Sequence, residues 1–110
     1  MQKTTYIAEF EELVLLAILK LGSNAYGASL HEALEDAGRK VTVGALYTTL
    51  SRLEDKGLVS SWMGEPTLER GGRAKKYFKI LATGARALRN AEAARRKLSP
   101  QFDFALGGLK

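Results

Sequence analysis

The amino-acid sequence predicts a mainly α fold with a small β-hairpin (α+β), arranged as a winged helix-turn-helix plus a C-terminal dimerisation helix. Apolar residues recur at helical spacing over residues 42–57, which indicates a helix with one buried face. Two strand-like segments follow at residues 58–64 and 75–81. The loop between them, residues 65–73, carries a Gly-Gly pair that suits a tight hairpin turn. A helix followed directly by a hairpin is the layout of a winged helix.

Length and composition limit the class of protein to which this chain can belong. The chain has 110 residues, of which 45% are hydrophobic and 26% charged, as expected for one globular domain. Within it we expect a winged helix-turn-helix region over residues 1–81 and a dimerisation helix and tail over residues 82–110. No apolar run reaches the roughly 18 residues that a membrane span needs, so no membrane partner is expected. The sequence has no cysteine and no secretory pattern at its start, which favours a cytoplasmic protein.

Charge is distributed unevenly along the chain. Residues 1–38 carry two lysines and six acidic residues, whereas residues 39–110 carry 15 of the 17 basic residues and the other six acidic residues. A basic region on one part of a fold is typical of a protein that binds a polyanion. A basic surface that only contacts solvent would give the same count. The placement of the cations in the fold therefore has to distinguish polyanion binding from a solvated surface.

The first predicted helix runs from about Phe10 to Leu21 and ends at Gly22. Its apolar residues wrap around nearly the whole helix, which indicates burial on more than one side. In so small a domain the second side suggests a partner chain, although a central core helix would show the same pattern. The predicted dimer interface combines this helix with the small apolar residues of the last helix: Phe10, Leu13, Val14, Ala17, Leu88, Ala91, Ala94 and Leu98.

The second helix ends near Ala37 at Gly38 and turns Leu30 and Leu34 inward. The third begins at the candidate N-cap Thr42. Its apolar residues are expected to face the core: Val43, Leu46, Leu50 and Leu53. Gly57 ends this helix.

The last helix is predicted over residues 82–98, where Ser99 and Pro100 end it. The tail beyond it contains Phe102, Phe104 and Leu106, which either pack across a dimer or lie loose.

The outward face of the third helix suits the major groove of DNA, which is wide enough for an α-helix and exposes base edges to its first residues. Gly44 and Ala45 let the backbone approach closely, and Arg52 can reach guanine or a phosphate. The Tyr47 ring can pack while its hydroxyl reaches a phosphate, although a core-edge aromatic and an ion pair of Arg52 with Asp55 are simpler alternatives. The predicted DNA-binding residues of this segment are Thr42, Gly44, Ala45, Tyr47, Thr48, Ser51 and Arg52.

The hairpin adds a cluster of cations. Arg70, Arg73, Lys75 and Lys76 place four basic side chains within seven residues. Cations in this position can neutralise phosphates, which makes binding steeply salt-dependent. Lysines on an edge strand also discourage aggregation, so their presence alone does not establish that the hairpin binds DNA.

Together these segments resemble the PadR family of bacterial transcriptional regulators over about residues 10–98. The matching segments are Glu12–Leu16, Tyr26–Gly27, Gly44–Tyr47, Leu50–Glu54, Lys56–Val59, Gly72–Tyr77 and Gly84–Leu88. The resemblance implies a homodimer that represses transcription by binding an inverted-repeat operator, with the third helix in the groove and the terminal helices forming the dimer. The single C-terminal helix is similar to that of the compact branch.

Two departures limit what the resemblance implies. Leu81 stands where similar sequences carry a capping threonine, so either Thr83 caps the last helix at a later position or the start of the helix is left to water. Some compact members bind flat aromatic drugs between tryptophans at the dimer interface, but the only tryptophan here, Trp62, lies on the first hairpin strand. The sequence therefore supports no such pocket, and an effector, the operator and the regulated genes stay undefined.

Other function classes have weaker support. His31 is the only histidine and is expected at the surface, and no phosphate-binding loop is present, so no enzyme, cofactor or metal site is predicted. A winged-helix module that binds proteins instead of DNA would share the fold. An RNA or non-specific nucleic-acid binder would need more exposed aromatic residues.

Overall fold

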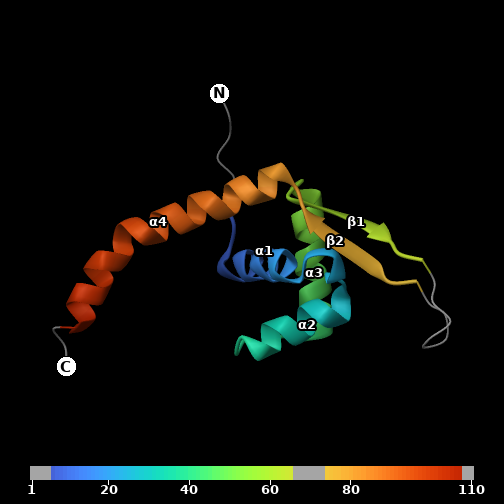
Figure 1. The fold of residues 1–110 in the computed structure, drawn as a ribbon, viewed down its shortest axis with the longest axis horizontal. Helices are drawn as coiled ribbons and strands as arrows, with labels where there is room; N and C mark the ends of the chain where they lie inside the picture. The colour runs from blue at the N-terminus through green and yellow to red at the C-terminus, as the bar shows by residue number, and fades with distance from the viewer. Residues whose placement is uncertain (1–5, 66–73, 108–110) are drawn as a thin grey trace.

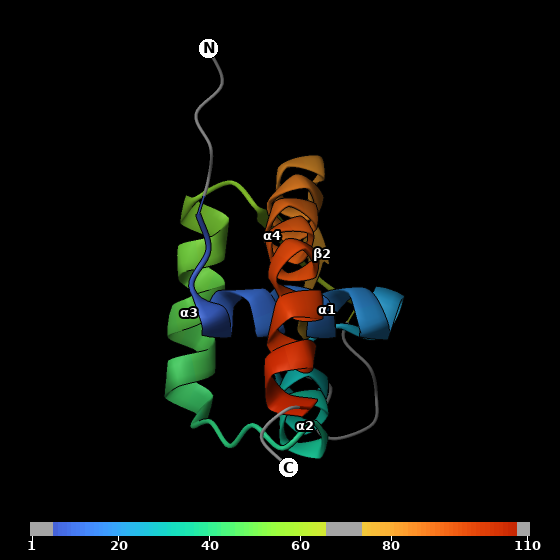
Figure 2. The same cartoon turned by 90° about the vertical axis from the view of Figure 1, so that its left-hand side faces the viewer.

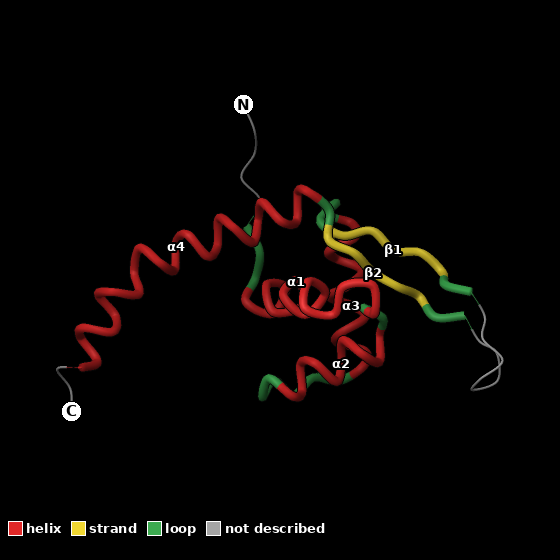
Figure 3. Tube along the Cα trace, in the orientation of Figure 1, coloured by secondary structure: helices red, strands yellow, loops and turns green. Residues whose placement is uncertain are grey.

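The computed structural model describes the backbone of residues 6–65 and 74–107 and the side chains as far as Ser99. Helices α1, α2 and α3 form the body, a two-stranded hairpin extends from it, and α4 projects from it on the other side (Figures 1 and 3). The elements are α1 (Glu9–Leu21), the 3-10 turn η1 (Gly22–Asn24), α2 (Gly27–Asp36), α3 (Val43–Asp55), β1 (Val59–Met63), β2 (Lys76–Ile80) and α4 (Ala82–Gly107).

One apolar core joins these elements. Helix α1 runs across both α3 and α4 (Figure 2), so its buried face contacts most of the fold. The largest fully buried side chains are Phe78, Leu15, Leu30, Leu46, Leu50, Leu53, Leu58 and Val14. Their positions confirm the inward faces predicted for α2 and, except for Val43, for α3.

The hairpin is antiparallel and lies against the start of α2. Its register pairs Val59 with Ile80 and Met63 with Lys76. On the outer edge of β2, the amide N–H of Phe78 donates to the carbonyl oxygen of Ala25 at 2.9 Å. The Phe78 ring is thereby buried against the helices. The hairpin of β1 and β2, called the wing below, is therefore anchored to the helical body through β2.

Local signals place the helix ends where the sequence predicts them. Gly22, Gly38 and Gly57 follow α1, α2 and α3, each with a positive φ that residues with a Cβ rarely adopt. Thr42 caps α3, because its Oγ1 accepts a hydrogen bond from the Ala45 N–H at 3.1 Å.

Val43 does not face the core as predicted, because it is 56% exposed. It is the first residue of α3, before Leu46, the first buried residue of this helix.

The predicted end of the last helix is also wrong. Helix α4 continues through Ser99 and Pro100 to Gly107. A proline removes one N–H and crowds the preceding turn, so it can bend a helix without ending it. Figure 1 shows that α4 curves along its length.

Thr83 does not cap α4 either. The helix begins at Ala82, and the Leu81 carbonyl oxygen accepts from the Ala85 N–H at 2.9 Å. The Thr83 hydroxyl instead donates to the carbonyl oxygen of Gly57. This hydroxyl ties the start of α4 to the end of α3. None of the helices that the structure describes is long and apolar enough to cross a membrane.

Gly84→Ala is expected to lower the free energy of unfolding. A Cβ at this position would overlap the Leu58 carbonyl oxygen and lie 2.8 Å from Cγ1 of Ile80. Overpacking of this kind costs about 1–3 kcal/mol. Gly44→Ala is the matched control in the first turn of α3, since a Cβ there has nothing within 4 Å. That variant should gain roughly 0.5–1 kcal/mol from helix propensity. Urea unfolding measures the free energy of unfolding of both variants. A Gly84→Ala protein as stable as the unmodified one would contradict the prediction.

Candidate nucleic-acid interface

The outward face of α3 is small and polar. All seven residues predicted to contact DNA in this segment are exposed: Thr42, Gly44, Ala45, Tyr47, Thr48, Ser51 and Arg52. Their partners on the opposite face, Leu46, Leu50 and Leu53, are buried. Thr49, which the sequence analysis did not single out, is buried with them. In the described part of the chain, Arg52 forms no ion pair with Asp55, so its guanidinium remains available on this face.

The start of α3 is fixed by two contacts. The Tyr47 ring packs on the first residue of α2, where a Cβ on Gly27 would overlap the Tyr47 hydroxyl. The hydroxyl therefore lies against α2 instead of pointing freely outward. In the preceding loop, the His31 Nε2 donates to the Val41 carbonyl oxygen at 2.7 Å. The His31 side chain is 25% exposed, so it is only partly at the surface where the sequence predicts an exposed residue. Its ring ties α2 to the segment that leads into α3.

The end of α3 is held by a carboxylate from α1. Both oxygens of Glu11 lie 2.8 Å from Nζ of Lys56, and Glu11 also accepts the Ala8 N–H. Glu11 is only 6% exposed. Burial acts to raise the pKa of this carboxyl, but the hydrogen bonds from Lys56 and Ala8 and the charges of Lys56 and Arg52 outweigh burial and lower the pKa. The ionised form is thereby stabilised in the folded state.

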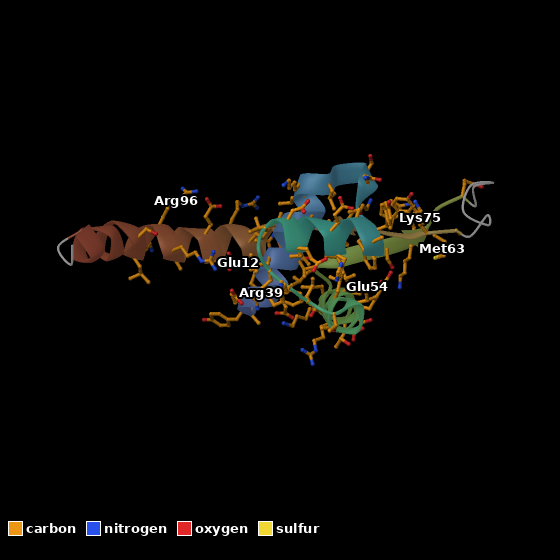
Figure 4. The ribbon with its side chains drawn as sticks, turned by 90° about the horizontal axis from the view of Figure 1, so that it is seen from below. Glu12, Arg39, Glu54, Met63, Lys75 and Arg96 are labelled. Carbon is orange, nitrogen blue, oxygen red and sulfur yellow. The ribbon has the colours of Figure 1, made fainter. Side chains whose placement is uncertain are left out.

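Two of the described cations on the hairpin, Lys75 and Lys76, contact groups of the same chain. The Lys75 ammonium lies 4.2 Å from the centre of the Tyr26 ring. The Lys76 Nζ lies 3.4 Å from Oε1 of Glu54 on α3. Figure 4 shows Glu54 at α3 and Lys75 on the hairpin, well away from Arg96 on α4. The other two predicted cations, Arg70 and Arg73, lie outside the described residues.

Aromatic residues pack together near the loop end of the two hairpin strands. Tyr77 stacks on Trp62 with ring centres 5.8 Å apart and meets Tyr26 edge-on at 5.5 Å. Trp62 stays partly exposed on the hairpin. The sequence analysis missed Tyr26 and Glu54 as residues that connect the wing to the helices, because their partners are far apart in sequence.

The predicted dimer interface divides into buried and exposed residues. Val14 is a wrong assignment, because it is completely buried within one chain, and Ala17 and Leu88 are nearly so. Phe10, Leu13 and Ala91 are partly buried, and Ala94 and Leu98 are exposed. The larger outward apolar residues of α1 are Leu16 and Leu19, 44% and 51% exposed. They line a cleft of about 580 Å³ between α1 and α4. The side chains of Phe102, Phe104 and Leu106 lie outside the described part.

This fold, with an exposed polar helix face beside a hairpin, is that of a winged helix-turn-helix regulator. The transcriptional regulator PadR-like family matches residues 15–90, and the chain belongs to this family.

Solved structures agree with the family assignment. A PadR-like transcription factor from Bacteroides fragilis shares 27% sequence identity with a TM-score of 0.72, covering 87% of this chain and 88% of the other. A PadR family regulator from Eggerthella lenta shares 31% identity with a TM-score of 0.68, covering 89% and 86%. Bacillus subtilis PadR in complex with operator DNA shares the fold with a TM-score of 0.62 at 16% identity, covering 76% of this chain and 46% of that one. The comparison with curated proteins gave no match.

Glu11→Gln is expected to weaken the fold in a pH-dependent way. Because folding lowers the pKa of Glu11, its charge stabilises the fold above the ordinary value of 4.5, and this contribution is lost as the pH falls through the lowered pKa. We expect a loss of about 1–3 kcal/mol at neutral pH and a shallower fall in stability on acidification than in the unmodified protein. Urea unfolding from neutral pH to about pH 3 measures both.

Glu9→Gln is the control for this prediction, because Glu9 forms an exposed pair with Arg39. Its loss should cost at most about 1 kcal/mol. Equal losses for the two variants would show that the buried pair has no special role.

Proposed function

We propose that the protein is a transcriptional repressor that binds double-stranded DNA as a homodimer on an inverted-repeat operator. The observation that carries the proposal is the outward face of α3, which is exposed, small and polar along a helix whose other face is buried. Family membership supports regulation of transcription. One solved structure of similar fold is bound to operator DNA.

Groove contact would start at the first turn of α3. Gly44 has open space where a Cβ would stand, so internal packing does not require glycine there. Glycine weakens a helix relative to alanine, and close approach to a partner is a physical reason to keep it. The hydroxyls of Thr48 and Ser51 and the Arg52 guanidinium can then reach base edges or phosphates. Arg70 and Arg73 would add phosphate contacts from the wing.

The homodimer would form through α1 and α4. Leu16 and Leu19 present apolar surface beside the cleft, and Leu98 is exposed on the part of α4 that projects from the body. Exposed apolar surface of this kind suits an interface between chains. A two-fold dimer would present two α3 helices to two half-sites.

Selection of bound sequences from a random duplex library at near-physiological salt tests the proposed function. The expected motif is palindromic, with half-sites about one helical turn apart. If folded protein enriched no motif, sequence-specific DNA binding would be excluded under those conditions.

Arg52→Ala and Thr48→Ala are each expected to relax base preference at particular positions of the selected motif. Loss of a bidentate contact to a base costs about 1–3 kcal/mol of discrimination. Arg73→Ala should instead weaken binding evenly across sequences, since a phosphate carries no sequence information. Lys97→Ala on α4 is the control and should leave the motif and the affinity unchanged. Competition binding with single-base variants of the operator measures these effects, and three unchanged affinities would contradict this docking geometry.

The double substitution Leu16→Glu and Leu19→Glu is expected to dissociate the dimer without unfolding the chain. Burial of each leucine contributes about 1.5–3 kcal/mol, so the dissociation constant should rise at least about tenfold. Met63→Glu is the control, since Met63 is an exposed apolar residue on the hairpin. Sedimentation velocity over a concentration series measures the equilibrium. A dimer of unchanged stability would move the interface away from this face of α1.

A further inference from the structure

The carboxylate of Glu54 contacts both strands of the hairpin. Its Oε2 accepts a hydrogen bond from Oγ of Ser61 on β1 at 2.6 Å. Its Oε1 lies 3.4 Å from Nζ of Lys76 on β2. In the strand register Met63 opposes Lys76, and Ser61 lies two residues before Met63, so Ser61 and Lys76 share the face that looks toward α3. One side chain near the end of α3 therefore fixes one hydroxyl and one ammonium of the wing.

The pair changes what the wing can offer to a polyanion. A free ammonium that neutralises a phosphate releases bound counterions and gains affinity. A lysine keeps its charge when it pairs with a carboxylate, but the pair as a whole has no net charge. A phosphate that draws the lysine away is then repelled by the Glu54 carboxylate left behind. Neither partner is fully buried, since the side chains of Lys76 and Glu54 are 45% and 30% exposed. The pair can therefore respond to a ligand at the surface.

We infer that Glu54 withholds the Lys76 cation from the DNA backbone and so sets the sequence-independent part of the affinity. This inference rests on the proposed DNA-binding function. It assigns to Lys76 a role different from the phosphate contact expected from the sequence. Base preference would then be set by the outward face of α3, while Glu54 limits the electrostatic attraction common to all sequences.

Glu54→Gln isolates the charge, because the amide oxygen can still accept the Ser61 hydrogen bond while the attraction to Lys76 is lost. The binding constant for an operator and for a scrambled duplex is measured over a salt series. With Lys76 released, the logarithmic salt slope should steepen by about 0.9, the value for one additional phosphate contact. Both duplexes should bind roughly three- to tenfold more tightly near 0.1 M salt, with their affinity ratio unchanged.

Two further variants make the assignment specific. Glu9→Gln is the matched control, since Glu9 forms an exposed pair with Arg39 at 2.8 Å and its replacement changes the net charge equally. It should leave the slope unchanged. Adding Lys76→Gln to Glu54→Gln should restore the original slope. Lys76→Gln alone should leave the slope unchanged but weaken binding to both duplexes, because Glu54 then carries an unpaired negative charge.

The outcomes separate the alternatives. An unchanged slope in Glu54→Gln, or an equal change in Glu9→Gln, overturns the inference. A shallower slope in Lys76→Gln alone also overturns it, because Lys76 would then already contact a phosphate. If Glu54→Gln does not fold, as judged by circular dichroism, the salt slope of Lys76→Gln alone still tests whether Lys76 contacts a phosphate. If the unmodified protein binds no duplex, the proposed function fails instead.

Discussion

The position of α1 at the centre of the fold is the constraint on which the other elements depend. Its apolar face fills the core, and two adjacent acidic residues on it are almost completely buried. Carboxylates can be buried only when they are paired. Glu11 meets Lys56 just after α3, and Glu12 meets Arg95 on α4 at 2.7 Å. One helix therefore fixes both the element proposed to enter DNA and the element proposed to join two chains.

The same pairs explain the uneven charge of the sequence. The three acidic residues of α1 each hold a cation from later in the chain, including Arg39 through Glu9. Part of the basic excess is consequently neutralised inside the molecule and does not act on a ligand. A count of charges along the sequence overestimates the positive field, since only a structure distinguishes paired cations from free ones. Arg52 remains unpaired within the described part of the fold, on the face proposed to meet DNA.

The sequence predicts features that depend on neighbouring residues and misses those that depend on distant ones. The glycines after the first three helices, the Thr42 cap and the burial of Leu46 follow from local geometry and periodicity. The contact of His31 with Val41 and that of Glu54 with the hairpin require the tertiary fold and the strand register. Pro100 misleads for a different reason, because a proline disfavours a helix without forbidding it. The arginines of the wing loop lie outside the described residues, so their placement stays a prediction from sequence.

These restraints separate the two contributions to the proposed DNA binding. Helix α3 is held near its start through Tyr47, just beyond its end through Lys56 and toward the hairpin through Glu54. Its outward face is therefore presented as a rigid surface. Such a surface favours base discrimination because few side chains or loops have to be ordered when DNA binds. That face offers one unpaired cation, so most of the electrostatic attraction has to come from other parts of the molecule. Specificity and non-specific affinity would thus reside on different elements, and the ion pair between α3 and β2 is the point at which the fold couples them.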